Sequence, residues 1–388
     1  MNRFPFSRGS VVWCRRVRAM TRKELLQLWR DPILLFFIAY AFTADIYLAG
    51  SGVSLELKNA TTVYQDNDDS FASRELVSRF QPPHFRLEGR VTHPQEALRL
   101  LDAGRTMVAL EVPPKFEETL RRGDEAGVQM QVDATHSVLG FFAYSYGSEI
   151  VGRYGLEAGL ARAGFSEADL NTLPVIQNEE RIWFNPNQNE SWFMSLTELL
   201  NIITLFAMLL PAAAMVREKE RGTIEQLLVS PLSPFQIMLP KVLSMTLVIL
   251  LGTTLSLWVV LKLAFGFPFR GSLVLFFAVT TLYTFTTTGI GLFLATITRN
   301  LGQAGLLALV IYTPMVFLSG AWTPPEAMPV VMRGFMYLSP LHYFLDASLG
   351  IMLKGGGLAL VWHSVLGIAL LGGAMFGLCL LRFRRQFK

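Results

Sequence analysis

The sequence of 388 residues predicts an α-helical integral membrane protein with six transmembrane helices and an α/β domain between the first two. Its composition is 52% hydrophobic and only 16% charged, and its mean hydropathy is +0.39, which is too apolar for a soluble protein with an ordinary charged surface. Six apolar runs are long enough to cross a hydrocarbon core of about 30 Å. The long segment between the first two runs alternates strand-like and helix-like stretches.

Residues 1–31 are predicted to form an elbow helix that lies in the cytoplasmic interface. Among their arginines, apolar side chains recur at roughly helical spacing, at Trp13, Val17, Met20, Leu25, Leu28 and Trp29. Asp31 and Pro32 end this helix. The alternative is a basic flank that only sets the membrane topology. The first span follows at residues 32–53, and without a small-residue cleavage pattern it is expected to be an uncleaved helix.

Residues 54–190 are predicted to form an extracytoplasmic α/β domain. Strands are expected at 61–65, 85–91, 106–112 and 128–132, and helices at 70–80, 94–103, 114–122 and from 137 onward. The segment contains no cysteine, so it must fold around its own apolar core. Its 21 Asp and Glu residues outnumber 13 Lys and Arg, and this acidic balance gives no support for nucleic acid as a partner.

The second span is expected at residues 192–216, entered at the interfacial Trp192, and a charged loop follows at 217–237. Gly222 breaks the preceding run, and Thr223 is placed to cap a new helix with Gln226. Pro231 ends that helix after about two turns.

This short helix is predicted to have one apolar face. Ile224, Leu227 and Leu228 fall at positions i, i+3 and i+4, whereas Glu225 points elsewhere. An exposed apolar face of this kind indicates a protein partner.

The remaining spans are expected at residues 238–261, 273–297, 304–320 and 358–381, with a tail at 382–388. The segment 321–357 is moderately apolar but broken by prolines and by three glycines at 355–357, so it is not one spanning helix. Two short re-entrant helices that dip into the outer leaflet would satisfy its backbone where they pack against protein. An amphipathic surface loop is the alternative.

Basic residues in the short loops set the orientation of the chain. The side that holds both termini carries 17 Lys and Arg residues, whereas the opposite short loops carry four: Lys262, Arg270, Arg333 and Lys354. Positive charge favours the cytoplasmic side, so both termini are predicted to be cytoplasmic. The spans are expected to be surrounded by membrane lipid.

No sequence motif for catalysis or for a resident metal is present. No lysine follows a glycine, so the Gly-x-x-x-x-Gly-Lys phosphate loop is absent, and the five histidines show no His-Glu-x-x-His spacing. The acidic run 66–69 begins like a calcium loop, but Phe71 stands where the sharp-turn glycine belongs, which favours a turn before a helix cap at Ser70. The chain is therefore expected to be a non-enzyme without a cofactor of its own.

Three carboxylates lie at or near membrane depth: Asp45, Glu198 and Asp346. An ionisable group costs about 2.5 kcal/mol or more at the centre of a spanning helix, so such groups usually face a partner or a cavity. At about 1.5 Å per residue, Asp45 and Glu198 are at similar depth, so they are candidates for a translocation path. The alternative is that each pairs with a neighbour such as Lys262 or with interfacial water.

The charged loop carries the pattern Arg-Glu-x-Glu-x-Gly-Thr-x-Glu-x-Leu-Leu-x-x-Pro over residues 217–231, followed by Lys241. This pattern resembles the coupling loop of ABC-2 type (type V) exporter permeases, and the elbow helix, six spans and proline-broken segment extend the resemblance over the whole chain. By resemblance, the residues that couple to an ATPase are Glu218, Glu220, Gly222, Thr223, Ile224, Glu225, Leu227, Leu228 and Pro231.

The resemblance also implies a set of partners. These are a second permease copy or paralogue and separate ATP-binding subunits that hold ATP and Mg. The large α/β domain is similar to that of the subgroup that works with a periplasmic HlyD-type adaptor and, in some systems, an outer-membrane channel. The expected function is export of an amphipathic or hydrophobic cargo. The alternatives are an ion-driven secondary carrier, for which no inverted repeat is visible, and a membrane-anchored scaffold or sensor.

Overall fold

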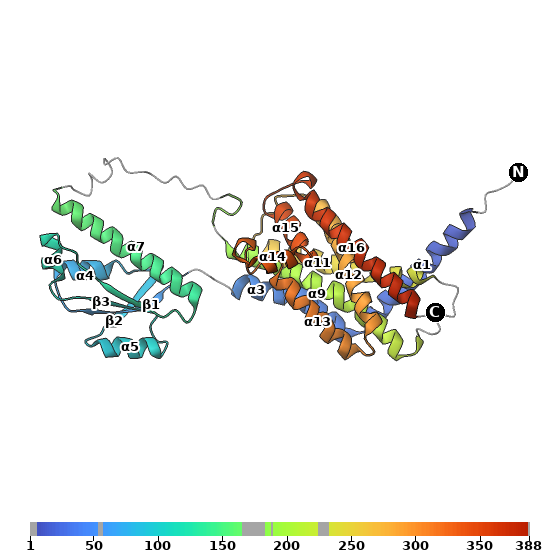
Figure 1. Cartoon of the computed structure of the whole chain (residues 1–388), viewed down its shortest axis with the longest axis horizontal. Helices are drawn as coiled ribbons and strands as arrows, with labels where there is room; N and C mark the ends of the chain where they lie inside the picture. The colour runs from blue at the N-terminus through green and yellow to red at the C-terminus, as the bar shows by residue number, and fades with distance from the viewer. Residues whose placement is uncertain (1–5, 53–56, 165–182, 188, 224–232, 387–388) are drawn as a thin grey trace. The chain divides into compact units, whose positions relative to one another are not determined.

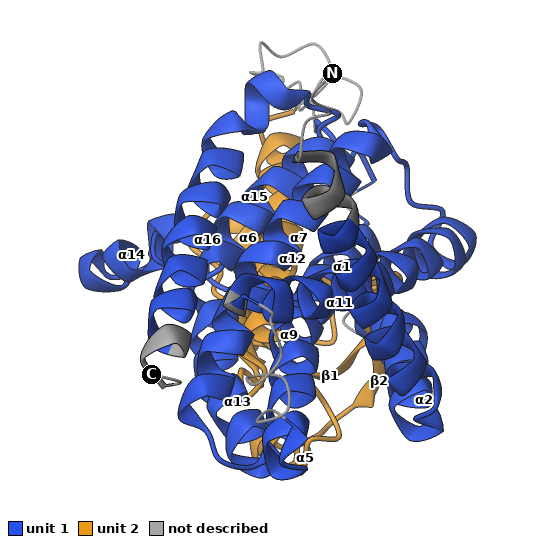
Figure 2. Cartoon of the chain, turned by 90° about the vertical axis from the view of Figure 1, so that its right-hand side faces the viewer, with its two compact units in different colours: residues 1–53, 182–388 blue, residues 54–181 orange. Residues whose placement is uncertain are grey.

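The structure is a computed structural model that describes residues 6–52, 57–164, 183–187, 189–223 and 233–386 (Figure 1). The chain forms two compact units (Figure 2). Unit 1 comprises Met1–Val53 and Ile182–Lys388, and unit 2 comprises Ser54–Arg181. Each unit has its own buried apolar clusters.

Unit 2 is built on a four-stranded sheet with the order β2-β1-β3-β4. The strands are β1 (Ala60–Asp66), β2 (Phe85–Arg90), β3 (Val108–Val112) and β4 (Gln129–Val132). β1 pairs in parallel with β2 and with β3, and β4 runs antiparallel to β3. Each strand expected from the sequence overlaps one of these. The central strands β1 and β3 carry the buried apolar residues that make such a stretch recognisable.

Four helices cover the two faces of this sheet: α4 (Phe71–Ser78), α5 (Pro94–Asp102), α6 (Phe116–Arg122) and α7 (Ser137–Arg162). One buried cluster joins the sheet to α4, α6 and α7, and a smaller cluster joins its other face to α5 (Figure 1). Ser70 begins α4 with a reciprocal capping box to Ser73, so the acidic run before it is a turn and a helix cap, as the sequence indicated.

Unit 1 is helical in its described residues. It begins with α1 (Phe6–Trp29), α2 (Pro32–Tyr40), the π-helical η1 (Ala41–Asp45) and α3 (Ile46–Gly52). It continues with α9 (Glu190–Glu220), α11 (Pro234–Leu255), the π-helical η2 (Ser256–Ala264), α12 (Leu273–Ile297) and α13 (Leu301–Phe317). The last elements are the short 3-10 turn η3 (Pro325–Ala327), α14 (Val330–Met336), α15 (Pro340–Met352) and α16 (Leu358–Gln386).

Five of the described helical segments are long and apolar enough to cross a membrane: Pro32–Gly52, Glu190–Glu220, Phe235–Ala264, Leu273–Ile297 and Leu358–Arg382. The helix at the expected fifth span, α13, is apolar but has 17 residues. α9 is the central helix, since 78% of its most apolar window is buried and it packs against α3, α11, α12, α13 and α15. The proline-broken segment forms the two short helices α14 and α15.

Two details of the helices differ from the sequence expectation. α9 continues to Glu220, so the first four residues of the expected charged loop extend the helix, because Arg, Glu and Lys are good helix formers. Gly222 then adopts φ +67°, a left-handed conformation that glycine favours. The π-helical turns η1 and η2 were not expected; there Ser256 Oγ donates a hydrogen bond to the Phe42 carbonyl and joins the two helices.

Candidate functional site

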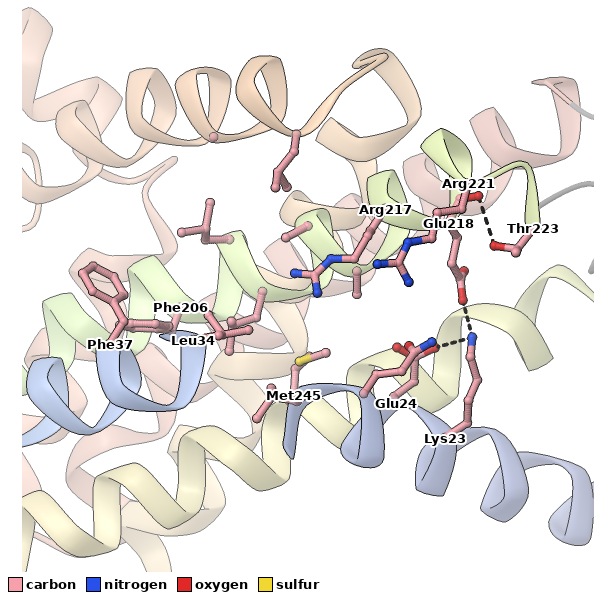
Figure 3. Close-up of a pocket in the computed structure, with 18 of the residues that line it drawn as sticks. Lys23, Glu24, Leu34, Phe37, Phe206, Arg217, Glu218, Arg221, Thr223 and Met245 are labelled. Carbon is pink, nitrogen blue, oxygen red and sulfur yellow. Dashed lines mark hydrogen bonds and ion pairs between the residues drawn. The ribbon is translucent and has the colours of Figure 1, made fainter. Parts of the chain in front are cut away.

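The candidate site begins with four ionisable side chains from three helices. Lys23 and Glu24 come from α1, Glu218 from the last turn of α9, and Lys241 from the second turn of α11. Lys241 Nζ lies 2.8 Å from Glu24 Oε1 and 2.8 Å from Glu218 Oε2. Lys23 Nζ lies 2.5 Å from Glu218 Oε1 (Figure 3). We call these residues the ion quartet.

The ion quartet is mostly buried. The exposed fraction of the side chain is 0% for Lys241, 2% for Glu24 and 7% for Glu218, whereas Lys23 reaches solvent. The Lys241–Glu218 contact is an ion pair without the angle of a hydrogen bond. Burial acts to lower the pKa of Lys23, but its hydrogen bond and charge contacts with Glu218 and Glu24 raise that pKa above the ordinary value. The two carboxylates and two ammonium groups therefore neutralise one another.

Charged residues next to Glu218 attach the end of α9 to the elbow, to α12 and to α13. Arg217 lies 3.5 Å from Asp31, which caps α2 by accepting from the Leu34 N–H. Lys219 Nζ donates to the carbonyls of Ala295 and Thr298 at the end of α12, where a helix leaves carbonyls without partners. These contacts fix α9 to the elbow and to α12.

Glu220 makes the corresponding contact with α13. Its Oε1 accepts from the Leu301 N–H at 2.9 Å, in the first turn of that helix. Thr223 Oγ1 donates to the Glu218 carbonyl at 3.2 Å. The expected coupling residues Glu218, Glu220, Gly222 and Thr223 thus close the end of α9 and hold it to its neighbours. The other expected residues lie outside the described residues: Ile224, Glu225, Leu227, Leu228 and Pro231.

Of the three carboxylates expected at or near membrane depth, two lie on neighbouring elements. Asp45 lies on η1 and Glu198 on α9, and these two elements pack against each other. Glu198 Oε2 accepts from Asn201 Nδ2 at 3.1 Å. Lys262, a candidate partner, instead lies 5.7 Å from the centre of the Phe269 ring.

The third carboxylate has a different neighbour. Asp346 on α15 accepts a hydrogen bond of 2.6 Å from Ser364 Oγ on α16. The described residues contain no group of three or more His, Cys, Asp or Glu side chains that could hold a metal ion.

A cavity of about 640 Å³ opens beside the ion quartet, between α9 and the α1–α2 elbow (Figure 3). Its apolar end is lined by Leu34, Phe37 and Phe206, and its polar end by Arg217 and Arg221. The site therefore combines a neutral buried ion cluster with an adjoining amphipathic cavity.

The role of several residues of this site was not predicted from the sequence. The sequence places Lys23 among the basic residues of the predicted elbow helix, and it gives Glu24 and Asp31 no role as partners for the charged loop. A signal was available for Glu24, because it is the single acidic residue among the first 30 positions. An isolated carboxylate in a basic helix indicates an ion pair, but it does not indicate whether the cation lies in the same helix or in another.

Known proteins similar to this chain are membrane permeases. Residues 25–381 match the family described as ABC-2 family transporter protein. The chain is 35% identical to the inner membrane transport permease YhhJ of Escherichia coli, over 94% of this chain and 95% of the relative. It is 29% identical to the probable multidrug ABC transporter permease YbhR of the same organism, over 96% and 99%. With the probable multidrug ABC transporter permease YbhS, also from E. coli, the identity is 26% over 97% and 98%.

Proposed function

Because the chain belongs to the ABC-2 family of transporter proteins, we propose that it is the membrane-spanning permease subunit of an ATP-driven exporter. ATP and Mg are bound by a separate ATP-binding subunit on the cytoplasmic side. The cargo is amphipathic or hydrophobic, which suits apolar spans and the multidrug permeases named among the relatives. It moves outward from the cytoplasm or the inner leaflet.

The observation that carries this proposal is the ion quartet. Glu218 precedes the coupling segment 224–232 and Lys241 follows it, so the chain on both sides of that segment is attached to α1. Movement of this segment, when the ATPase displaces it, is then transmitted to α9, α11 and the elbow together. α9 transmits this movement to the largest part of unit 1, because it packs against α3, α11, α12, α13 and α15.

The coupling residues divide into two roles in this mechanism. Ile224, Leu227 and Leu228 fill an apolar groove on the ATPase, and Glu225 contacts its rim. Pro231 ends the contacting helix. Glu218 and Glu220 act within the chain: they pass movement of the segment to α1, α11 and α13 through their ion pairs and the Leu301 N–H.

The proposed topology has six spans, with α13 as the fifth. Its 17 residues give a length of about 26 Å at about 1.5 Å per residue, close to the minimum for a span. Both termini are cytoplasmic in the bacterial inner membrane, and unit 2 lies outside. The functional assembly contains a second permease copy or paralogue, and unit 2 binds an HlyD-type adaptor that leads to an outer-membrane channel.

Asp45 and Glu198 are proposed to face the cargo path, since they lie on η1 and α9, which pack against each other inside the helical unit. Asp346 belongs to the outer end of the path, where its hydrogen bond to Ser364 joins α15 to α16. The same pair of carboxylates is the observation that favours the second candidate function, an ion-driven carrier.

Purification of the tagged full-length chain from membranes after mild cross-linking distinguishes these functions. We expect an ATP-binding subunit with a Gly-x-x-x-x-Gly-Lys loop to be identified by mass spectrometry, and ATP hydrolysis in the purified complex. Export that continues without ATP and follows the proton gradient, with no ATP-binding protein in the purified sample, would favour the carrier.

A further inference from the structure

We propose that the cavity beside the ion quartet binds an anionic phospholipid of the cytoplasmic leaflet, with the head group on Arg217 and Arg221 and an acyl chain along the apolar end. The proposal rests on the proposed function for the location of this end of α9 at the cytoplasmic leaflet. It adds a ligand class and a binding site to that function.

The shape of the cavity suits an acyl chain. Phe206, Leu209, Ala213 and Arg217 recur at spacings of three or four residues, so they line one face of α9 along the cavity. From Phe206 to Arg217 this face is roughly 16 Å long at about 1.5 Å per residue. The small side chains of Ala213 and Ala214 leave space along the middle of this face. The cavity therefore follows this face of α9 as a slot whose inner end is apolar.

The charge at the other end of the slot is positive. Lys23, Glu24 and Glu218 also line the cavity, but their charges are matched within the ion quartet. Arg217 is partly matched by Asp31 at 3.5 Å. Among the described residues Arg221 has no ion-pair partner, and Figure 3 shows its guanidinium beside that of Arg217, both directed into the space between α9 and α1.

These features select the ligand. A guanidinium binds phosphate through planar, charge-assisted hydrogen bonds, and two adjacent guanidinium groups offer a phosphate several such donors. An apolar slot that continues from this point adds burial of hydrocarbon, which a free phosphate cannot provide. Anionic phospholipids combine both groups and are present at the cytoplasmic surface, where basic residues attract them.

Native mass spectrometry of the purified full-length chain tests this assignment without any ATPase. Phosphatidylglycerol is added to the delipidated protein and compared with phosphatidylethanolamine of the same acyl chains and with inorganic phosphate. We expect phosphatidylglycerol to bind at least about tenfold more tightly than phosphatidylethanolamine, which corresponds to about 1.4 kcal/mol. Inorganic phosphate should not compete at equal concentration.

Matched variants locate the site. Arg221→Gln should remove the preference for phosphatidylglycerol, whereas Arg299→Gln should retain it, because Arg299 is an exposed cytoplasmic arginine outside the cavity. Ala213→Leu, which fills the slot, should weaken both lipids. Unfolding temperatures of all three variants near that of the parent chain show that the fold is intact.

Two outcomes overturn the proposal. One is an unchanged preference for phosphatidylglycerol in Arg221→Gln. The other is a disulfide between two copies that carry Ala213→Cys, because the slot is then occupied by a second copy of the chain. Neither outcome bears on whether an ATP-binding subunit copurifies, so failure here is distinguishable from failure of the exporter assignment.

Discussion

Glu218, in the last turn of α9, and Lys241, in the second turn of α11, form a 2.8 Å ion pair in which both side chains are buried. The coupling segment 224–232 lies between them in the sequence. Glu24 of the elbow helix contacts the same ammonium group at 2.8 Å. The elbow and the chain on both sides of the segment are thus joined at a single cation, because Lys241 belongs to α11 and contacts both α1 and α9.

Removal of this cation should destabilise unit 1. Lys241→Met leaves Glu24 and Glu218 buried with only Lys23 to neutralise them, and breaking a buried ion pair in this way costs about 3–5 kcal/mol. Thermal unfolding of the purified protein in detergent should show a clear decrease in unfolding temperature. Lys262→Met is the matched control, because Lys262 is exposed and forms no ion pair with a described residue, so it should change stability by less than about 0.5 kcal/mol.

Neutralising Glu218 in addition to removing Lys241 should restore part of the lost stability. In the double variant Lys241→Met with Glu218→Gln, one buried acid faces Lys23, so the unfolding temperature should exceed that of Lys241→Met alone. Equal unfolding temperatures for the two variants would mean that the four side chains do not act as a charge-balanced unit.

The carboxylates of Asp45 and Glu198 should be required for export rather than for assembly. Asp45→Asn and Glu198→Gln keep the size of each side chain but remove charge from a region where charge is costly. Export in cells should therefore fall while the amount of protein in the membrane stays at the parent level. Asp346→Asn tests the proposed outer end of the path separately, since this residue has Ser364 as its partner. Loss of either path variant from the membrane would instead assign that carboxylate a structural role.

The two cysteines report topology in different ways. Cys14 is exposed, whereas Cys379 on α16 is completely buried. A membrane-impermeant maleimide should leave Cys14 unmodified in intact cells and modify it after the cytoplasmic face is opened. Cys379 should stay unmodified in both cases until the protein is denatured. Modification of Cys14 in intact cells would place the N-terminal end outside and overturn the proposed orientation.

Unit 2 should fold alone and lose stability in acid. Burial acts to raise the pKa of Asp68, but hydrogen bonds from Ser70 and from the backbone N–H groups of residues 115–117 lower that pKa below its ordinary value. An acid of depressed pKa stabilises the fold above its unfolded pKa of about 3.9, and this contribution is lost as the pH falls through that value towards the folded pKa.

Chemical denaturation of residues 54–181 at pH 7 and at pH 3 measures this contribution. Asp68→Asn should be less stable than the parent at pH 7, and the difference should narrow at pH 3. Asp124→Asn, at an exposed position, should follow the parent at both pH values. An unchanged difference between Asp68→Asn and the parent at the two pH values would show that protonation of Asp68 does not contribute to acid unfolding.

The sequence was sufficient for features that depend on local pattern. The strands of unit 2 were predicted because their apolar residues are bounded by turn-forming residues, as between β1 and α4. The end of the charged helix was located to within a few residues because Gly222 takes a left-handed conformation there. The pattern of the charged loop was specific enough to indicate its family.

Features that depend on tertiary packing were beyond the sequence. Glu24 and Lys241 meet because α1 packs along α11, and no periodic pattern encodes which face of one helix meets which face of another. The inward direction of Glu218 has the same cause, since a glutamate in a charged loop is ordinarily expected to face solvent. The cavity also arises between elements far apart in the chain.

Copurification of the ATP-binding subunit with the tagged full-length chain and with Leu227→Asp tests the exporter assignment most directly. The aspartate introduces a charge into the proposed apolar contact with the ATPase, whereas Leu227→Met keeps that contact apolar and serves as the control. We predict that the parent and Leu227→Met retain the subunit and that Leu227→Asp inserts into the membrane but loses it. Recovery of the ATP-binding subunit with Leu227→Asp at the parent level would contradict the account.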